Sequence, residues 1–479
     1  MQLFTDALHR SLEENTVYGK FLITENPDSE LPDFEVSVSL MNRFMLRADL
    51  YFITTLMEHS DIFRDFSETE IPSFNAEDRE IYAGYHPYFY EFHARSTDTR
   101  LRAIMREYAG QWLLMHFDDT PPEDEEISLA GTMSFSASPL ISKGKTLKFN
   151  PASLFDSTCH TLDKLYSKKN VNLYTGKCVN DSSTFTKFKS ILPTDIRYVE
   201  GTVYSVGLAN NISLTLEDPG HRFVTLLYDI GCTHVKSVCE RPDVEDNLDH
   251  FKYERVDAVI LSHWDSDHIL GVGYYNPDNL YSKDIVWIAP DLNLLSEQEL
   301  SVGAARLACY VAHKSNLYLA NQLDSKLDTH NKVLELWQGK GKKSGQATHN
   351  NNIGLLIELN GFGFADGMSH RYYWKRRYFP RPFFHKVHAL LTGDCVFDNI
   401  PDTLKSTRYD LLVTPHHGTD LSIPDINGTD DSTAIICADE SGTAVSYPGS
   451  KHVMGLLQHN FTNILITQYQ GNIHFRIFT

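Results

Sequence analysis

Short apolar runs, spaced along the C-terminal part of the sequence, are the feature that most limits how this chain can fold. From about residue 196 onward they are separated by helical stretches and bounded by turn-forming residues; examples are VDAVI, DIVWIAP, NIGLLIELNG and YDLLVTP. Such runs are typical of strands buried on both faces, and their alternation with helices indicates sheets covered by helices. The sequence therefore predicts an α/β layered domain over residues 196–479.

Potential metal ligands follow one of these predicted strands directly. The stretch SHWDSDH, which overlaps the end of the run VDAVILS, contains His263, Asp265, Asp267 and His268. Because desolvating a carboxylate without a partner costs several kcal/mol, the stretch is either a solvated loop or a site where cations compensate the acids. Imidazole nitrogens and carboxylate oxygens bind divalent metals, and a tight turn can present them to two ions.

Two later predicted strands end in residues of the same kinds. LLTGDC brings Asp394, and LLVTPHHG brings His416 and His417. Sites in α/β domains are built at strand ends, so these side chains can complete a two-metal site that stabilises both oxygens of a displaced phosphate ester. Two alternatives stay open: a set of unrelated polar turn residues, and a degenerate hydrolase-like domain that binds no metal.

The motifs HxDxDH, TGD and PHHG, in this order and each after an apolar run, resemble those of the metallo-β-lactamase superfamily, most closely the hydrolase domain of late-competence DNA-uptake proteins. Further matches are a VGxGNxxxL-like turn, an Asp-x-Gly strand end, the run NNNIGLLIEL and the segment SYPGSKHVMGLL; they include Val206, Gly207, Asn210, Leu214, Asp229, Gly231 and His452. The resemblance covers roughly residues 196–479 and implies an αββα sandwich fold.

Six metal ligands are implied by this resemblance: His263, Asp265, Asp267, His268, Asp394 and His417. Of these, His263 and Asp265 would bind a first ion, Asp394 would bridge, and the other three would bind a second ion. His417 is preferred over His416 because the superfamily's last ligand commonly lies two residues after a strand-ending proline. Four catalytic residues are implied: Asp267 and Asp394 to hold the attacking water, and His416 and His452 to protonate the leaving oxygen or bind the phosphate.

The sequence also departs from the commoner superfamily pattern. That pattern has a histidine where Asp265 stands and another from a separate loop, for which His349 lies near the right place. An oxygen-rich ligand set favours manganese or magnesium over zinc relative to a three-histidine site. We therefore expect two divalent metal ions as cofactors, with manganese, zinc and magnesium all open.

A basic, aromatic segment at residues 369–388, SHRYYWKRRYFPRPFFHKVH, stands out in an otherwise acidic chain. Cations neutralise phosphates and aromatic rings stack on unpaired bases, so the segment is a candidate for binding nucleic acid. The predicted substrate-binding set is Arg371, Trp374, Lys375, Arg376 and Arg377, with Asn351 from the asparagine-rich run. The alternative is a hairpin whose aromatics pack and whose arginines pair with the acidic N-terminal part.

Before residue 196 the sequence has a different texture. Apolar residues recur at three- and four-residue spacing, and an acidic run, DDTPPEDEE, interrupts the pattern at residues 118–126. This predicts a mainly helical N-terminal domain over residues 1–126, a mixed connecting region over 127–195 and the hydrolase domain over 196–479. The N-terminal region is a candidate docking site for a protein partner.

Composition narrows the function further. The formal net charge of −20 argues against a broad nucleic-acid-binding surface without excluding a local one. Seven scattered cysteines, with no CxxC pair, predict reduced thiols. No run approaches the roughly 18 apolar residues of a membrane helix, and the N-terminus lacks a signal-peptide pattern. A cytoplasmic protein without membrane contact is therefore expected.

Together these features favour a metal-dependent phosphodiesterase or nuclease that cleaves nucleic acid with metal-activated water. A hydrolase of a small phosphoester or cyclic nucleotide is the first alternative. A partner-binding or sensing protein with a regulated or vestigial hydrolase domain is the second. Salt separates the first two, because binding of a polyanion weakens steeply as salt rises.

Overall fold

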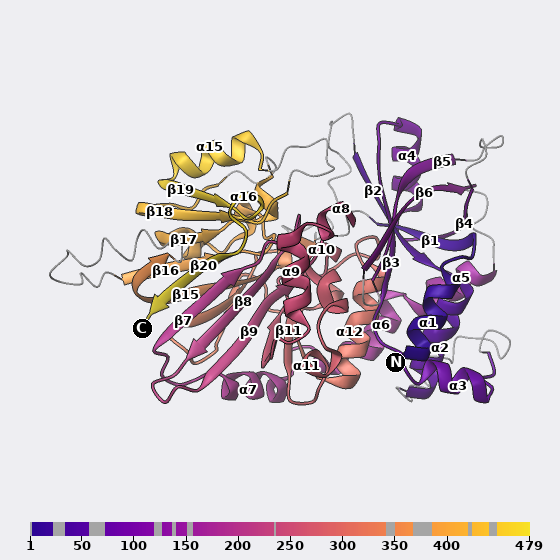
Figure 1. Ribbon diagram of the computed structural model, residues 1–479, viewed down its shortest axis with the longest axis horizontal. Coiled ribbons are helices and arrows are strands. Elements are labelled where there is room, and N and C mark those ends of the chain that lie inside the picture. The colour runs from indigo at the N-terminus through magenta and orange to yellow at the C-terminus, as the bar shows by residue number, and fades with distance from the viewer. Residues whose placement is uncertain are drawn as a thin grey trace. The chain divides into compact units, whose positions relative to one another are not determined.

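The computed structural model (Figure 1) describes residues 2–22, 34–56, 72–118, 127–136, 140–150, 157–233, 236–341, 350–366, 386–419, 424–439 and 448–479. The chain divides into two compact units. The first, here called the barrel unit, comprises Met1–Lys177 and Leu295–His313. The second, the sheet unit, comprises Cys178–Leu294 and Lys314–Thr479.

The barrel unit is built around a closed, antiparallel barrel with the strand order β1-β2-β3-β5-β6-β4. Its strands are β1 (Thr16–Leu22), β2 (Phe34–Met41), β3 (Phe89–Ser96), β4 (Trp112–Phe117), β5 (Ile127–Ser136) and β6 (Leu140–Phe149). Valine and leucine alternate with serine along β2, the period of a strand. Phe21, Phe92 and Phe149 are fully buried, and the rings of Phe21 and Phe149 lie 5.2 Å apart. Aromatic side chains therefore form much of this core.

The expectation of a mainly helical N-terminal domain is wrong. Helices are present, namely α1 (Gln2–Ser11), α2 (Arg43–Tyr51), the π-helix η1 (Phe52–Leu56), α3 (Ala76–Tyr82) and α4 (Thr99–Tyr108), but strands β1 to β4 alternate with them. The stretch SVSLM, within the region predicted to be mainly helical, is the end of β2, and α2 begins only after Asn42, whose side chain accepts a hydrogen bond from the Met45 amide. In a stretch this short, the spacing of the apolar residues fits a helix as well as a strand, so the sequence pattern alone does not distinguish them.

The expected domain boundaries also shift. Within the predicted connecting region, Ile127–Ser136 and Leu140–Phe149 form β5 and β6, which pair along ten residues and close the barrel. Helices α5 (Ser157–Leu165) and α6 (Lys168–Thr175) complete the unit, whereas α7 (Ser182–Ile191) belongs to the sheet unit. Barrel closure depends on pairing between β1 and β4, about a hundred residues apart in sequence, which local patterns do not reveal.

A helix from the middle of the chain also belongs to the barrel unit. Helix α12 (Val302–Lys314) lies in sequence between β11 (Val286–Pro290) and β12 (Asn316–Ala320), which are parallel neighbours in the sheet unit. Its Arg306 is buried and contacts Asp49 of α2, with Nη2 2.8 Å from Oδ2. The chain therefore leaves the sheet unit, adds a helix to the barrel unit, and returns.

The sheet unit contains a 14-stranded mixed sheet. The main path runs β12-β11-β10-β9-β8-β7-β20-β15-β16-β17-β18-β19; off this path, β14 pairs with β15, and β13 pairs with β14. The remaining strands are β7 (Tyr198–Val203), β8 (Asn211–Glu217), β9 (Phe223–Ile230), β10 (Ala258–Ile260), β13 (Ser325–Leu327), β14 (Leu334–Gln338), β15 (Leu355–Asp366), β16 (Lys386–Leu391), β17 (Tyr409–Val413), β18 (Gly428–Ile436), β19 (Phe461–Ile466) and β20 (Ile473–Phe478).

Strands at both ends of this path are parallel, and those in the middle are antiparallel. Strands β9 to β12 form one parallel set and β16 to β19 the other. One core cluster contains Ile260 and Val286 from the first set and Leu391 and Val413 from the second, so the two sets share a core. The predicted mixed α/β architecture is confirmed here, while the specific αββα arrangement stays a prediction.

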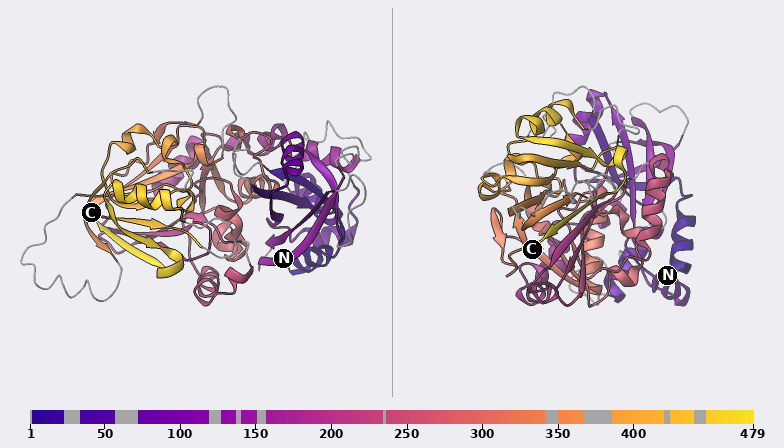
Figure 2. Two further views of the ribbon diagram at one scale, coloured as in Figure 1. Left: turned by 90° about the horizontal axis from the view of Figure 1, so that it is seen from above. Right: turned by 60° about the vertical axis from the view of Figure 1, so that its left-hand side comes forward.

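Short helices occupy the connections between strands. They are α8 (Lys236–Cys239), α9 (Pro242–Phe251), α10 (Ser266–Ile269), α11 (Pro277–Leu280), α14 (Asp402–Lys405), α15 (Ser450–Gln458) and α16 (Thr467–Gln470). Helix α15 lies beside β19 (Figures 1 and 2), and its Leu456 shares a core cluster with Phe461 and Ile436. Within the described ranges, every helix is too short or too polar to span a membrane.

Candidate metal centre

The predicted metal ligands leave the ends of strands in both parallel sets. His263 follows β10, and Asp267 and His268 lie on the four-residue helix α10 just beyond it. Asp394 follows β16, and His417 lies in the 3-10 turn η10 (His416–Gly418) after β17. Because β16 and β17 are parallel neighbours, their carboxyl ends open at the same edge of the sheet.

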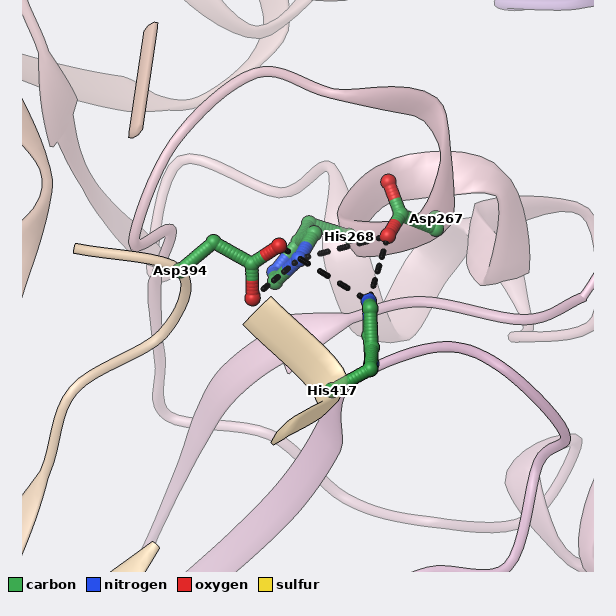
Figure 3. Close-up of side chains that lie close together, drawn as sticks. All are labelled: Asp267, His268, Asp394 and His417. Atoms are coloured by element: carbon green, nitrogen blue, oxygen red, sulfur yellow. Dashed lines mark hydrogen bonds and ion pairs between the residues drawn. The ribbon is translucent and has the colours of Figure 1, made fainter. Parts of the chain in front are cut away.

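Four of these side chains converge. Asp267, His268, Asp394 and His417 each offer one ligand atom, and the four atoms lie within 4.8 Å of one another (Figure 3). Nε2 of His417 is 2.8 Å from Oδ2 of Asp267, and Nε2 of His268 is 3.3 Å from Oδ1 of Asp394. Two imidazoles and two carboxylates are a suitable ligand set for a divalent metal ion.

Hydrogen bonds on the far side of each imidazole orient its Nε2 atom toward this group. Nδ1 of His268 lies 2.7 Å from Oδ2 of the fully buried Asp229. Nδ1 of His417 lies 2.7 Å from the backbone oxygen of Cys437, which can only accept a hydrogen bond, so Nδ1 carries the proton. Nδ1 donors of this kind hold metal-binding histidines in the required tautomer.

Unpartnered nitrogen atoms provide a second test of whether a metal fits. In the described part of the chain, the buried Nε2 atoms of His263 and His268 form no hydrogen bond, although carboxylate oxygens lie 3.2–3.6 Å away. An unpartnered polar atom that is fully buried is costly. A cation bound among these donors removes that cost, so the residues present fit a divalent metal ion.

The charges of the group are strongly coupled. Burial disfavours the ionised carboxylates, yet the pKa of Asp267 and that of Asp394 are held below their usual range, chiefly by His268 and His417. Burial likewise disfavours the imidazolium of His268, but Asp394, Asp229 and Asp267 raise its pKa well above the usual value. Burial also disfavours the imidazolium of His417, but Asp394 and Asp267 raise its pKa. Without a metal, protons on the imidazoles therefore compensate the acids.

The other two predicted ligands lie beside this group without belonging to it. His263 is fully buried, its ring centroid is 4.0 Å from that of His268, and its Nε2 is 3.2 Å from Oδ2 of Asp265. Asp265 is the N-cap residue of α10. A second ion bound by His263 and Asp265 stays a prediction.

The two candidate catalytic histidines also lie near the ligands. The backbone amide of His416 donates to Oδ1 of Asp394 at 3.0 Å, and burial lowers the pKa of the His416 imidazole. His452 is buried at the start of α15 and packs beside the turn that carries His417, since a Cβ on Gly418 would lie 3.5 Å from its ring.

Left-handed backbone occurs next to several of the ligands. His416, His417 and Gly418 are three consecutive residues with positive φ, of 50°, 53° and 75°. Asp229 and Gly393 add φ angles of 59° and 54°. A non-glycine residue in this region costs on the order of 1–3 kcal/mol, and such strain clusters at functional sites. Here it turns the chain sharply after β16, just before Asp394, and after β17, at His417 itself.

Three supporting residues were not predicted as part of the site. Asp229 accepts hydrogen bonds from the amide and hydroxyl of Ser262 at 2.6 and 2.8 Å in addition to its contact with His268. Nδ2 of Asn210 donates to Oδ1 of Asp394 at 3.3 Å. Asp229 and Asn210 had been matched only to motif positions. The sequence does contain a signal for Asp229: it is an acid at the end of the apolar run LLYDIG, and a buried carboxylate is almost always paired with another group.

The predicted substrate-binding residues lie largely outside the described part of the chain. This holds for Arg371, Trp374, Lys375, Arg376 and Arg377, and for the possible loop ligand His349. The backbone of Asn351 lies in the 3-10 turn η7 (Asn350–Ile353). The role of the basic, aromatic segment therefore stays a prediction.

Comparison with protein-family models and with curated proteins finds no match to this sequence. Among solved structures, a diphosphatase from the PhnP family is 11% identical, with a TM-score of 0.29, and the match covers 56% of this chain and 86% of the diphosphatase. A long form RNase Z from yeast is 11% identical, with a TM-score of 0.32, and the match covers 58% of this chain and 41% of the RNase Z. Likenesses this weak carry no functional argument.

Proposed function

We propose that this protein is a metal-dependent hydrolase of phosphoesters, with the phosphodiester bonds of nucleic acid as its first candidate substrate. The observation that carries the proposal is the convergence of Asp267, His268, Asp394 and His417, with both imidazoles held in the tautomer that metal binding needs. The order of the sequence motifs, which resembles that of metallo-β-lactamase-type hydrolases, supports the same chemistry.

The four residues would hold a divalent ion, which when bound polarises a phosphoryl oxygen and lowers the pKa of water. Asp267 and Asp394 then accept hydrogen bonds from the attacking water and orient it. The hydrogen bonds that Asp394 receives from Asn210 and the His416 amide keep its carboxylate in one orientation. A carboxylate fixed in this way needs no rearrangement during the reaction.

The two further histidines have different proposed roles. Burial lowers the pKa of His416, so its imidazole is neutral near pH 7 and suited to donate a hydrogen bond to the scissile phosphate. His452, beside the turn that carries His417, is the candidate for protonating the leaving oxygen.

Substrate size remains the choice between two phosphoesterase functions. The basic, aromatic sequence of residues 369–388 favours a polymer, since it pairs cations with rings able to stack on bases. The net charge of −20 favours a small phosphoester, since it repels a polyanion. Turnover of single-stranded nucleic acid and of a chromogenic small phosphodiester should therefore be compared as salt rises; a steep loss with the polymer alone supports a nuclease.

Metal content provides the decisive test. The full-length protein, loaded with manganese or zinc and then freed of excess metal, should retain bound ion. Asp394→Asn should reduce the affinity by on the order of 100-fold or more, because it removes a charged ligand. Asp402→Asn, at an exposed acid paired with Lys340, is the matched control and should change nothing. A parent protein that binds neither metal would refute the proposal and favour a vestigial hydrolase domain with a partner-binding role.

A further inference from the structure

Two cysteine thiols lie together next to the metal-binding turn. Cys232 follows β9, and Cys239 ends α8; both are reduced. Each Sγ lies 3.4 Å from the backbone oxygen of Thr233, and the two side chains are also within hydrogen-bonding reach of each other, so each thiol proton can go to Thr233 or to the other sulfur. Seven positions apart in sequence, the two thiols are neighbours in the fold, which is the arrangement that disulfide formation requires.

The two thiols differ in exposure and in acidity. Cys232 is fully buried, whereas Cys239 is partly exposed. The hydrogen bond from Cys232 holds the pKa of Cys239 below its usual value, and the same bond, with burial, raises the pKa of Cys232. Because the thiolate is the reactive form, Cys239 is the thiol that an oxidant reaches first, and Cys232 is placed to resolve it.

The Cys232 side of the pair is joined to the metal ligands through the preceding residue. The amide of Gly231 donates to the backbone oxygen of Asn210 at 2.7 Å, and the Asn210 side chain donates to Asp394. A Cβ on Gly231 would lie 1.8 Å from the backbone oxygen of Asp267, so this backbone packs directly against the turn. A displacement of residue 232 therefore reaches two of the four ligands.

The Cys239 side is joined to the far end of the same turn. Cys239 hydrogen-bonds with Tyr274, the residue that follows the 3-10 helix η5 (Leu270–Gly273). Helix η5 continues directly from α10, which carries Asp267 and His268. The thiol pair thus bridges the strand end before the site and the helical turn that supplies two ligands.

We propose that Cys232 and Cys239 are a redox-responsive pair whose oxidation to a disulfide loosens the metal-binding turn and lowers its affinity for metal. The oxidant class is a peroxide: the Cys239 thiolate attacks hydrogen peroxide and, with one proton taken up, gives a sulfenic acid and water. The Cys232 thiol then displaces a second water and forms the disulfide. In total two thiols lose two electrons and two protons, and one peroxide becomes two waters.

Disulfide formation changes the surroundings in a definite way. The sulfur atoms move to about 2.05 Å from each other, and both side chains lose the thiol proton with which they hydrogen-bond to each other or to Thr233. The hydrogen bond between Cys239 and Tyr274 is lost at the same time. Disturbing groups that support metal ligands typically reduces metal affinity by about 10- to 100-fold. The effect on metal rests on the proposed function; the loosening of the turn does not.

The test uses the full-length protein, reduced and metal-free, before and after hydrogen peroxide. Peptide mapping by mass spectrometry should find a disulfide between residues 232 and 239 that dithiothreitol reverses. Hydrogen exchange of the amides in residues 262–275 should be about tenfold faster in the oxidised protein, because the turn has lost its support. Manganese affinity, measured by titration, should fall by about tenfold or more and recover on reduction.

Cysteine variants separate the disulfide from other effects of peroxide. Cys239→Ser should keep normal exchange and metal binding after treatment, and Cys309→Ser, in the barrel unit, should respond like the parent protein. Failure to form the disulfide, or a disulfide that leaves exchange in residues 262–275 unchanged, would overturn the proposal. If the reduced parent protein binds no metal, the proposed hydrolase function is refuted. Hydrogen exchange in residues 262–275 still decides whether the Cys232–Cys239 pair controls the turn.

Discussion

At the scale of single residues, His268 is the most informative member of the site. One ring nitrogen faces the metal ligands and the other contacts Asp229, so the two nitrogens have different tasks. The carboxylate at Asp229 can only accept a hydrogen bond when ionised, which places the proton of neutral His268 on Nδ1. Asp229 is thus a positioning residue, and its charge reaches the site through the imidazole.

Replacing this carboxylate should weaken metal binding without removing a ligand. In Asp229→Asn the amide can donate to Nδ1 and so favour the tautomer in which Nε2 carries the proton. We expect a fall in metal affinity of about 10- to 100-fold, measured by isothermal titration. Asp257→Asn, which changes an acid that caps the Thr225 amide in the same sheet, is the control. An unchanged affinity in Asp229→Asn would show that Asp229 does not set the tautomer.

The coupled charges predict a pH dependence of metal binding. The pKa of His268 and that of His417 are raised in the metal-free protein, so both imidazoles carry protons at pH values where free histidine, with a pKa near 6.5, has lost them. A metal must displace these protons. Metal affinity should therefore rise with pH until the raised pKa values are passed, and then level off.

Proton release gives a direct measurement of this effect. Titration calorimetry at pH 7 in two buffers of different ionisation enthalpy should detect protons released with each bound ion, and fewer at higher pH. The stability of the metal-free protein should change with pH in the opposite direction. The raised pKa of His268 stabilises the fold below pH 6.5, and this contribution is lost as pH rises through the pKa of the folded state. Binding without proton release at pH 7 would contradict the charge assignment.

At the scale of secondary-structure elements, α12 is held in the barrel unit by a buried ionic cluster. Asp49 accepts hydrogen bonds from Arg306 and from the hydroxyls of Tyr85, Tyr88 and Tyr166, and the guanidinium lies 3.9 Å from the Tyr88 ring centroid. These four donors compensate the charge of the buried Asp49 carboxylate, because a buried charge without partners is strongly unfavourable.

Removing the cation should therefore destabilise the barrel unit. Arg306→Met leaves the buried carboxylate of Asp49 without its cationic partner, and we expect a loss of about 3–5 kcal/mol in the free energy of unfolding. Arg476→Met, at a half-exposed arginine 2.9 Å from Glu200, should cost less than about 1 kcal/mol. Chemical denaturation followed by circular dichroism measures both. Equal effects of the two substitutions would mean that the cluster does not anchor α12.

At the scale of the whole molecule, the two units are interleaved in sequence. The crossover between parallel strands β11 and β12 passes through the barrel unit, where Gly303 packs on Phe89 and Tyr310 on Phe52. Eleven of the thirteen residues of α12 are buried. The barrel unit is therefore not an appendage that can be removed without exposing α12.

Truncation should expose this dependence. A fragment of residues 178–479 keeps every candidate metal ligand but leaves α12 without Asp49, Phe52 and Phe89, so a large apolar surface meets water. In size-exclusion chromatography we expect the fragment to aggregate and the full-length protein to elute as a single defined species. A monodisperse fragment that still binds metal would show that α12 folds without the barrel unit.

The sequence by itself determined the chemistry of the donors and their place at strand ends, because both are local: His263, Asp267, Asp394 and His417 each follow an apolar run within a few residues. Tertiary structure decided which donors converge, which carboxylate sets the tautomer of His268 from 39 positions away, and that β1 closes a barrel with β4. These outcomes depend on pairings between distant segments, and the free energy of such pairings comes from packing and burial rather than from the local pattern.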